Sequence, residues 1–375
     1  MIIGIDGNET NLQNRVGVNV YGFELLWGLQ EISPEWRRKH KLIVYLKNKP
    51  LSDMPKETDF FKYKIIPGGG IWILTKLMPR LLLNPDKLDL IFTPSHYVAP
   101  IAPIPRVCTI TDLGYLKFPT QFKKYDYWQL KYWSAISMLV AKYIITISES
   151  SKNDIVRHYP SFSNKVFVTP LSYNNYQSGP NISTKNVRQI KNKYTIVSDY
   201  IIYVGTLKPS KNIEGLIEAY SMIKNEIPNI QLVIVGRKGW LYETVFQRAR
   251  DLGLANKVIF TDFIPDEDKN ILIKNSKLFV LPSFWEGFGL DVLSALASGV
   301  PVVASDVASL PEVVGNAGIL VNPNDPKDIA HGMLSVLTMP KNEYDKLKAR
   351  GIRQSGKFSW DETARKTLEI LEKVE

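Results

Sequence analysis

The sequence is poor in the residues that build disulfide bonds and metal centres. Its 375 residues include one cysteine, Cys108, and four histidines. A single cysteine excludes an intramolecular disulfide and a cysteine-rich zinc site, and the scattered histidines form no metal-ligand motif. We therefore expect no metal and no disulfide. A reducing compartment fits this composition.

Long apolar runs are also missing. The most apolar stretch, residues 71–83, is interrupted by Lys76, Pro79 and Arg80 and is too short to cross a bilayer. The N-terminus begins directly with a strand-like run, without the charged and apolar regions of a signal peptide. These features predict a cytoplasmic protein, and residues 71–83 could lie on the inner face of a membrane.

The positive charge is concentrated in the first half. Residues 1–172 contain 22 Lys and Arg against 14 Asp and Glu, a balance of +8, whereas residues 173–375 contain 25 against 23, a balance of +2. Basic surface mixed with aromatics can attract nucleic acid or anionic lipid. Because no nucleic-acid module accompanies this charge, we expect no nucleic-acid partner. An anionic membrane surface is the functional alternative to charge that only solubilises.

Apolar strand-like runs alternate with helix-like segments along the chain. In the first half, the strand-like runs are residues 2–6, 42–46, 88–92, 107–110 and 144–147. In the second half, they are residues 200–204, 231–235, 258–260, 278–281 and 300–304. Continuous apolar strands separated by helices predict parallel sheets with both faces covered. We therefore expect an α/β fold of two doubly wound, Rossmann-like domains that face a central cleft.

Composition suggests where the two domains meet. Residues 173–199, rich in Asn, Ser, Tyr, Lys and Gly, are the predicted linker, with a short helix near residues 187–194. The predicted domains are residues 1–172 and 200–357. Residues 358–375 form an amphipathic C-terminal helix, for which Ser359 is the expected cap.

A helix predicted over residues 125–143 is unusually aromatic. We interpret most of its aromatic side chains as packing residues, and a contact with lipid or with an acceptor molecule is the alternative. These side chains are Tyr125, Tyr127, Trp128, Tyr132 and Trp133.

Residues 281–303 have the pattern strand, glycine turn, helix, strand. The turn contains Gly287 and Gly289, and the helix is expected from Leu290. Glycines let backbone N–H groups approach a ligand closely, and a helix N-terminus favours phosphate. Glu286 lies at the entrance of the turn, where it could accept hydrogen bonds from hydroxyls. The combination indicates a sugar phosphate or a sugar nucleotide, and an ordinary strand-to-helix connection is the alternative.

Seven motifs, in order along nearly the whole chain, resemble those of the retaining glycosyltransferases of family 4, the glycosyl transferases group 1. Such enzymes have the GT-B architecture of two facing Rossmann-like domains. The matching segments are residues 17–21, 110–113, 146–152, 204–207 with Lys211 and Asn212, 235–240, 284–290 and 309–315. The resemblance implies an acceptor-side first domain, a nucleotide-sugar-binding second domain, and a C-terminal helix that crosses back to the first.

The resemblance also implies a reaction, the transfer of a hexose from a nucleotide sugar with retention at the anomeric carbon and without a metal. Lys211 would be the main cation on the leaving diphosphate. Glu286 would bind sugar hydroxyls and support positive charge at the anomeric centre. The departing phosphate oxygen would itself take the acceptor proton. No cofactor is implied beyond the GDP-sugar or UDP-sugar co-substrate.

Further roles follow from the same motifs. The implied donor-binding residues are Gly17, Asn19, Gly205, Thr206, Arg237, Lys238, Phe263, Ile264, Phe288, Gly289, Leu290 and Ser294. The implied acceptor-side residues are Tyr21, Thr111 and Asp112. A solvated turn is the alternative for Arg237 and Lys238, and a purely structural role is the alternative for residues 263–265.

The sequence departs from the family pattern at several of these positions. Ser294 stands where a second glutamate usually holds the nucleotide ribose, and a serine cannot make the charged bidentate contact. Asn19 stands where a second glycine is common, Thr111 replaces a frequent histidine, and Asp291 replaces a frequent proline. These departures leave catalytic rate and donor identity open.

The leading interpretation is an enzyme that adds a hexose to a glycan or lipid-linked acceptor during synthesis of a surface polysaccharide or glycolipid. The loop of residues 204–212 resembles members that use GDP-mannose, and uridine-linked sugars stay open. A catalytically weak relative that binds a glycan or a partner protein is the alternative. A nucleotide-dependent oxidoreductase would need Gly-x-Gly-x-x-Gly after the first strand, and residues 4–9 lack it.

Overall fold

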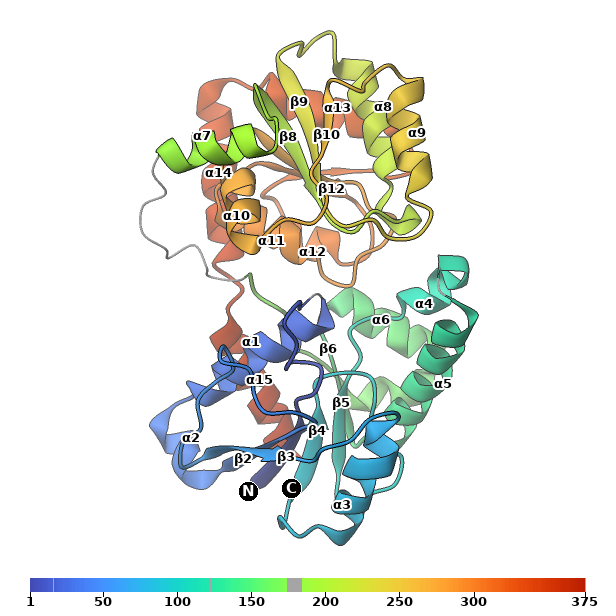
Figure 1. The fold of residues 1–375 in the computed structure, drawn as a ribbon, viewed down its shortest axis with the longest axis vertical. Helices are drawn as coiled ribbons and strands as arrows, with labels where there is room; N and C mark the ends of the chain where they lie inside the picture. The colour runs from blue at the N-terminus through green and yellow to red at the C-terminus, as the bar shows by residue number, and fades with distance from the viewer. Residues whose placement is uncertain (16, 122, 174–183, 375) are drawn as a thin grey trace. The chain divides into compact units, whose positions relative to one another are not determined.

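The computed structural model describes residues 1–15, 17–121, 123–173 and 184–374 (Figure 1). The chain divides into two compact units. The N-terminal unit comprises Met1–Leu171 together with Ser359–Glu375, and the C-terminal unit comprises Ser172–Phe358. Each unit contains one parallel sheet flanked by helices, which confirms the predicted α/β class with two Rossmann-like domains.

In the described part of the N-terminal unit, the sheet has seven parallel strands in the order β3-β2-β1-β4-β5-β6-β7. The order reverses between β1 and β4, as in a doubly wound sheet, and ligands bind at the carboxyl ends of the strands beside such a reversal. The strands are β1 (Ile2–Asp6), β2 (Lys41–Leu46), β3 (Phe61–Ile65), β4 (Leu90–Thr93), β5 (Arg106–Thr109), β6 (Tyr143–Thr146) and β7 (Val166–Val168).

Helices connect these strands, and three of those described begin at a capping serine, Ser33, Ser148 or Ser359. At Ser148, for example, Oγ accepts the N–H of Ser151 at 3.0 Å. The helical segments are α1 (Val18–Gln30), α2 (Pro34–Lys39), the π-helix η1 (Ile73–Leu77), α3 (Met78–Leu83), α4 (Gly114–Lys117), η2 (Pro119–Gln121), α5 (Lys124–Val140), α6 (Glu149–His158), η3 (Pro160–Lys165) and α15 (Trp360–Glu372).

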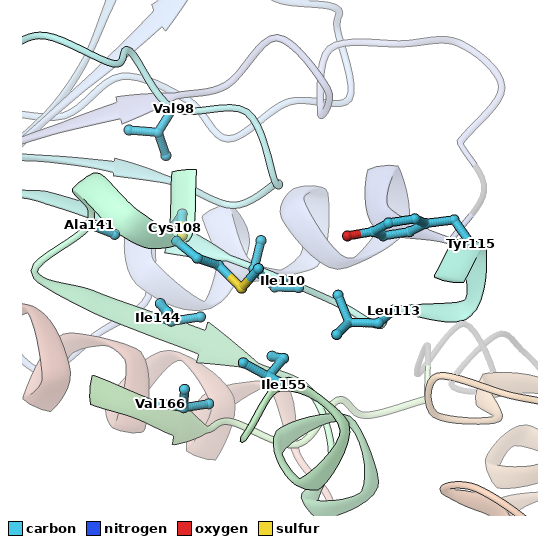
Figure 2. Packing of buried hydrophobic residues seen from close by; sticks show 10 residues of the cluster. Val98, Cys108, Ile110, Leu113, Tyr115, Ala141, Ile144, Ile155 and Val166 are labelled. Carbon is cyan, nitrogen blue, oxygen red and sulfur yellow. The ribbon is translucent and has the colours of Figure 1, made fainter. Parts of the chain in front are cut away.

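Figure 2 shows a core cluster of the N-terminal unit between β5, β6 and the helices that cover them. Its labelled members are Val98, Cys108, Ile110, Leu113, Tyr115, Ala141, Ile144, Ile155 and Val166. Burial raises the pKa of the Cys108 thiol to about 12, so the thiolate needed for reactivity is scarce. The cysteine is therefore a small apolar packing residue.

Helix α15 completes the N-terminal unit by packing against α1 (Figure 1). The contact is close at Gly28, where an added Cβ would lie 2.9 Å from Cβ of Ala364. At the far end of the helix, Nε2 of His40 lies 2.9 Å from Oε1 of Glu372. The C-terminal helix thus returns to the first domain, as the family resemblance implied.

The C-terminal unit has, among its described residues, a six-stranded parallel sheet in the order β10-β9-β8-β11-β12-β13, with the reversal between β8 and β11. The strands are β8 (Asp199–Val204), β9 (Ile230–Val235), β10 (Val258–Phe260), β11 (Leu278–Leu281), β12 (Val302–Ser305) and β13 (Ile319–Val321). The helical segments are α7 (Thr184–Lys193), η5 (Pro209–Lys211), α8 (Ile213–Ile223), α9 (Glu243–Asp251), α10 (Asp266–Lys274), α11 (Leu290–Ala297), α12 (Leu310–Val314), α13 (Pro326–Leu337) and α14 (Lys341–Ser355).

The structure corrects the sequence expectations at the sheet edges and in the linker. Strands β3, β7 and β13 were missed because each is a short edge strand with partly exposed side chains. Part of the predicted linker, residues 173–199, is an element of the C-terminal unit. Helix α7 packs against α10, and both Lys193 Nζ and the Tyr194 hydroxyl donate to Oδ2 of Asp268 at 2.6 Å. Residues 174–183 of that linker lie outside the described residues.

Candidate functional site

The two side chains predicted to carry the chemistry, Lys211 and Glu286, contact each other in the C-terminal unit. The ammonium of Lys211 donates to Oε1 of Glu286 at 2.5 Å. Ser283 Oγ donates to the same oxygen at 2.8 Å. The lysine and glutamate side chains are 17% and 12% exposed, so the pair is weakly screened by water yet still reachable by a ligand. The site therefore holds a cation and a carboxylate at one point.

Buried hydrogen bonds hold the loop of the lysine against the loop of the glutamate. The side-chain amide of Asn212 donates to the carbonyls of Pro282, at 3.1 Å, and Pro323, at 2.7 Å. Asn212 has a φ of 52°, a left-handed conformation that asparagine tolerates better than most residues. Between the same two loops, the N–H of Phe284 donates to the carbonyl of Ser210 at 2.9 Å. These bonds fix where the two charged side chains meet.

The glycine turn ahead of α11 has the form that the sequence predicted. Gly289 is the N-cap of α11 with a φ of 101°, and an added Cβ would lie 2.8 Å from Cδ2 of Leu310. A side chain at this position would therefore be both strained and crowded. The first turn of the helix, which begins at Leu290, places its backbone N–H groups and positive dipole end beside the turn.

Two contacts hold the backbone of this turn in place. Phe288 is 4% exposed, and its ring packs edge-to-face on Phe358 with centroids 5.7 Å apart. Ser309 Oγ donates to the backbone carbonyl of Glu286 at 2.9 Å. Phe288 could therefore serve a ligand through its backbone only, which is the role that the resemblance implied for it.

The loops that follow β8 and β9 are paired with each other. The N–H of Leu207 donates to the carbonyl of Arg237, and the N–H of Gly239 donates to the carbonyl of Leu207, both at 3.0 Å. Gly236 has a φ of 152°, and an added Cβ would lie 1.9 Å from the carbonyl oxygen of Gly205. Only glycine fits where these two backbones cross.

This crossing predicts a large effect for Gly236→Ala. Because the obstructing atom is backbone, we expect a loss of about 3 kcal/mol or more in the free energy of unfolding of the C-terminal unit. Gly253→Ala is the matched control: Gly253 has a φ of 65° and nothing within 4 Å of its added Cβ, so only backbone strain of about 1 to 2 kcal/mol applies. Denaturant unfolding measures both, and equal losses in the two variants would contradict the argument.

The remaining donor-side predictions separate into exposed and buried positions. Arg237 and Lys238 are exposed, and Lys238 Nζ lies 3.8 Å from Oδ2 of the exposed Asp262. Their role as a solvated turn therefore stays an alternative. Phe263 is 62% exposed and could meet a nucleobase, whereas the Ile264 side chain is 4% exposed and leaves only the backbone of this residue for such a contact. Thr206 and Gly205 are half-buried in the paired loops.

Ser294 does not replace the missing ribose carboxylate. Its Oγ donates to the carbonyl of Leu290, one turn earlier in α11, at 3.0 Å. This bond occupies the hydroxyl proton, and only oxygen lone pairs remain for a ligand. Asp291 lies in the same first turn, and burial raises its pKa against the opposing effect of Lys269 and Lys211. Position 294 therefore carries no carboxylate, and Asp291 supplies one three residues earlier in the helix.

In the N-terminal unit, the residues predicted near the donor and acceptor differ in how accessible they are to a ligand. Gly17 has a φ of 52° at the start of α1, with open space around its Cα. Asn19 Nδ2 donates to the backbone carbonyl of Glu9, at 2.9 Å, and to Glu9 Oε2, at 3.0 Å. Tyr21 is 0% exposed, and its hydroxyl lies 3.1 Å from Oγ1 of Thr109. This places Tyr21 in the core, and the predicted acceptor contact was wrong for it.

Thr111 and Asp112 follow β5 and are half-buried. Oδ1 of Asp112 accepts the N–H of Gly114 at 2.7 Å, so the carboxylate supports the start of α4. Neither placement excludes a ligand contact. The structure therefore gives Asp112 a local structural task beside its predicted acceptor-side role.

Comparison with known protein families gives a match within the C-terminal unit. The model of the glycosyl transferases group 1 matches residues 186–354, a region that includes the Lys211–Glu286 pair. Residues 186–354 thus match the glycosyl transferases group 1. The resemblance predicted from the sequence motifs is confirmed for this region.

Relatives with a similar sequence include proteins named as mannosyltransferases. The O-antigen chain mannosyltransferase B of Escherichia coli is 34% identical over 230 residues, which cover 61% of this chain and 60% of the relative. The serotype-specific mannosyltransferase WbdA of Escherichia coli is 33% identical over 229 residues, which cover 60% of this chain and 28% of the relative. The chain thus spans less than two thirds of the length of these relatives.

A solved structure extends the similarity to the entire chain. The Anabaena protein HepE, determined in complex with UDP and glucose, superposes with a TM-score of 0.74 over 99% of both chains at 17% identity. At this identity the likeness shows the fold alone. It confirms the predicted GT-B fold class.

One residue beside the group 1 site was missed by the sequence reasoning, which assigned residues 200–204 only as a strand. Tyr203 is 0% exposed, and its hydroxyl has no hydrogen-bond partner among the described residues. An added Cβ at Gly205 would lie 2.6 Å from this hydroxyl. Burial, together with the negative charge of Glu286 and Asp291, raises the pKa of Tyr203 well above its usual value. A neutral donor group therefore lies directly beneath the β8 loop.

A second missed group lies in the N-terminal unit, where Asp6 ends β1. Its side chain accepts both the backbone N–H and the amide of Asn8, at 3.2 and 2.8 Å. Burial raises its pKa to about 6, against these hydrogen bonds and the charge of Lys47. A carboxyl group at the carboxyl end of β1 is readable from the sequence, but its burial is not.

This raised pKa predicts how Asp6→Asn changes stability with pH. Because Asp6 binds its proton more tightly when folded, wild-type stability is fully present below about pH 4 and falls as pH rises through 6. The asparagine variant avoids this loss, so it should gain about 2 to 3 kcal/mol over wild type near pH 8 and little at pH 4. Denaturant unfolding across pH tests this, with the exposed Asp59→Asn as control. A gain that is the same at both pH values would contradict it.

Proposed function

We propose that the protein is a retaining glycosyltransferase that moves a mannosyl residue from a nucleotide-sugar donor to a growing surface glycan. The observation that carries the proposal is the contact between Lys211 and Glu286 beside the glycine turn of α11. A cation, a carboxylate and a helix N-terminus at one point suit a diphosphate joined to a sugar. The names of the two Escherichia coli relatives support the mannosyl group and the polysaccharide product.

The proposed chemistry uses charge more than proton transfer. The ammonium of Lys211 would stabilise the leaving diphosphate, and the backbone N–H groups of Gly289 and Leu290 would bind its oxygens or those of the sugar. Glu286 would accept hydrogen bonds from the sugar and stabilise positive charge at the anomeric carbon. Because donor and carboxylate compete for one ammonium, donor binding would loosen the Lys211–Glu286 contact.

The bond changes balance without a protein base. The bond from the anomeric carbon to the phosphate oxygen breaks, and the acceptor oxygen bonds to the same face of that carbon. The departing phosphate oxygen takes the acceptor proton, so the products are the glycosylated acceptor and a nucleoside diphosphate. Metal independence is part of the proposal, since Lys211 and the amide dipoles supply the positive charge that this leaving group needs.

The donor in the proposal is GDP-mannose. The loop style of residues 204–212 and the names of the relatives support it. The exposed ring of Phe263 offers a face for a nucleobase. HepE, which shares the fold, was solved with UDP and glucose, so UDP-sugars are the alternative to test. The ribose would be held without the usual carboxylate, because position 294 is a serine. The hydroxyl of Ser294 already donates to its own helix.

The acceptor would be a glycan or a lipid-linked glycan at the inner face of a membrane. None of the helices in the described ranges is long and apolar enough to span a bilayer. A peripheral contact has support in α3, where Leu82 and Leu83 are 49% and 82% exposed, and in the net positive charge of residues 1–172. Sedimentation with liposomes tests the contact, and equal binding to neutral and anionic vesicles would count against electrostatic docking.

The decisive experiment incubates the purified chain with GDP-mannose, UDP-glucose and other nucleotide sugars, with and without a mannan oligosaccharide. We expect release of the nucleoside diphosphate, transfer of the sugar in the presence of EDTA, and a product whose anomeric configuration matches that of the donor. A chain that gains no thermal stability with any nucleotide sugar and hydrolyses none would instead be a non-catalytic glycan- or partner-binding relative.

A further inference from the structure

A groove of about 760 Å³ opens in the N-terminal unit. One wall comes from α5, and the facing wall comes from residues 70–74, which run into the π-helix η1. Its polar end lies at the carboxyl ends of β1 and β2. The groove is therefore built on the switch point of the sheet, where α/β folds bind ligands.

The wall from α5 is an exposed aromatic surface, contrary to the packing role expected from the sequence. Tyr125, Trp128 and Tyr132 all line the groove and are 74%, 46% and 60% exposed. The rings of Trp128 and Tyr132 are stacked, with centroids 5.3 Å apart and planes 14° apart. Because stacked rings cover part of each other's faces, the pair forms one compact aromatic platform, with the outer faces and the edges of the two rings left for contacts.

The facing wall is held rigidly. Trp72 is 1% exposed, and its Nε1 donates to the carbonyl of Ile66 at 2.8 Å, which fixes the ring at the base of the wall. Gly70 has a φ of 61°, which turns the chain into the wall, and Ile71 is 52% exposed at its rim. The π-helix η1 that follows is a rare form that occurs often at functional sites.

The polar end of the groove is acidic. Asp6 and Glu9 line it, and Lys47 is the one cation among its described lining residues. Two carboxyl groups against one ammonium disfavour a phosphate or diphosphate and favour groups that donate hydrogen bonds. Asn19 already donates to Glu9, so the glutamate is held in place at this end.

An apolar platform beside hydrogen-bond acceptors matches the two faces of a sugar ring. The C–H face of a pyranose can pack on an aromatic ring, while its hydroxyls donate to carboxylates. A polyprenyl chain would use the platform but would leave the acidic end without a partner, and its diphosphate would be repelled there. The charge of the groove therefore favours a neutral carbohydrate over the lipid part of an acceptor.

We propose that this groove binds a neutral oligosaccharide, with its rings packed against the exposed aromatic platform of Trp128 and Tyr132 and its hydroxyls bound by Asp6 and Glu9. The identification of this oligosaccharide as the growing glycan rests on the proposed function. Binding itself does not, because the groove is complete within the N-terminal unit.

The test measures binding of α-mannotriose and maltotriose to the full chain by calorimetry, without any donor. We expect at least one of the two to bind, and Trp128→Ala and Tyr132→Ala each to weaken that binding by about tenfold or more. Leu139→Ala is the matched control, because Leu139 is 67% exposed on the same helix and does not line the groove. Circular dichroism confirms that the variants are folded.

Three outcomes would overturn the proposal, and a fourth would separate it from the proposed function. Binding of decyl phosphate without binding of either oligosaccharide would assign the groove to a lipid. Absence of binding by all three probes, or oligosaccharide binding that both aromatic variants retain, would place the glycan elsewhere. A groove that binds oligosaccharide in a chain that transfers no sugar would leave this inference standing and refute the proposed function.

Discussion

Replacing Glu286 by glutamine should lower kcat by about 100- to 1000-fold, the range expected when one preorganised charge is removed from a transition state. Glutamine keeps the shape and one acceptor oxygen, so Ser283 can still donate to it. What it loses is the negative charge that would stabilise a positive anomeric centre. We expect KM for the donor to change far less than kcat, because the loss falls on the transition state. Steady-state kinetics with GDP-mannose measures both constants.

Two controls make the Glu286 result specific. Glu226→Gln removes an exposed carboxylate from the same unit and should leave kcat unchanged. Ser294→Ala removes a hydroxyl that bonds to its own helix, so it should raise the donor KM by a few-fold at most. Wild-type turnover in Glu286→Gln would refute the assignment of this carboxylate, whatever the serine variant does.

Lys211→Met should reduce kcat/KM by about 1000-fold or more and should also weaken binding of the product nucleoside diphosphate. The methionine side chain is similar in length and apolar, so the change removes the ammonium with little change in packing. We expect the thermal shift produced by GDP to fall to that produced by GMP, since Lys211 would serve the diphosphate. Lys224→Met, at the half-buried C-cap position of α8, is the control.

A double variant distinguishes shared from separate roles. Lys211 and Glu286 contact each other. The increases in activation free energy caused by Lys211→Met and by Glu286→Gln should therefore sum to more than the increase in the double variant. Full additivity would mean that the contact has no part in the reaction. An undiminished response of Lys211→Met to GDP would show that another cation binds the diphosphate.

The glycine turn and its helix were predictable because their signals are local. A strand, two glycines and a helix within residues 281–303 leave few other folds, and the left-handed Gly289 agrees with that pattern. The meeting of Lys211 with Glu286 was different. These residues are 75 positions apart, and their meeting depends on Asn212 and on the backbone bond between Phe284 and Ser210, which no local pattern contains. Only the family resemblance brought the pair together beforehand.

Burial was the property that the sequence predicted least well. The core position of Tyr21 and the bond from Asn19 to Glu9 depend on which way helix α1 faces, and its apolar residues allow more than one answer. The aromatic residues of α5 posed the opposite problem. Trp and Tyr at helical spacing are usually packing residues. In the sequence, an exposed row of them has the same spacing as a buried one, so only the elements packed around the helix distinguish the two.

The return of α15 to the first unit also sets an order of events during synthesis. A ribosome makes the whole of residues 172–358 before it makes the helix that covers α1. Until then the surface around Gly28 has no cover, although the strands beside it are already made. The C-terminal unit is contiguous and can fold as soon as its last helix, α14, has been made. The N-terminal unit is begun first and completed last, which leaves its α1 surface open to chaperones, or to aggregation, for the time that half a chain takes to make.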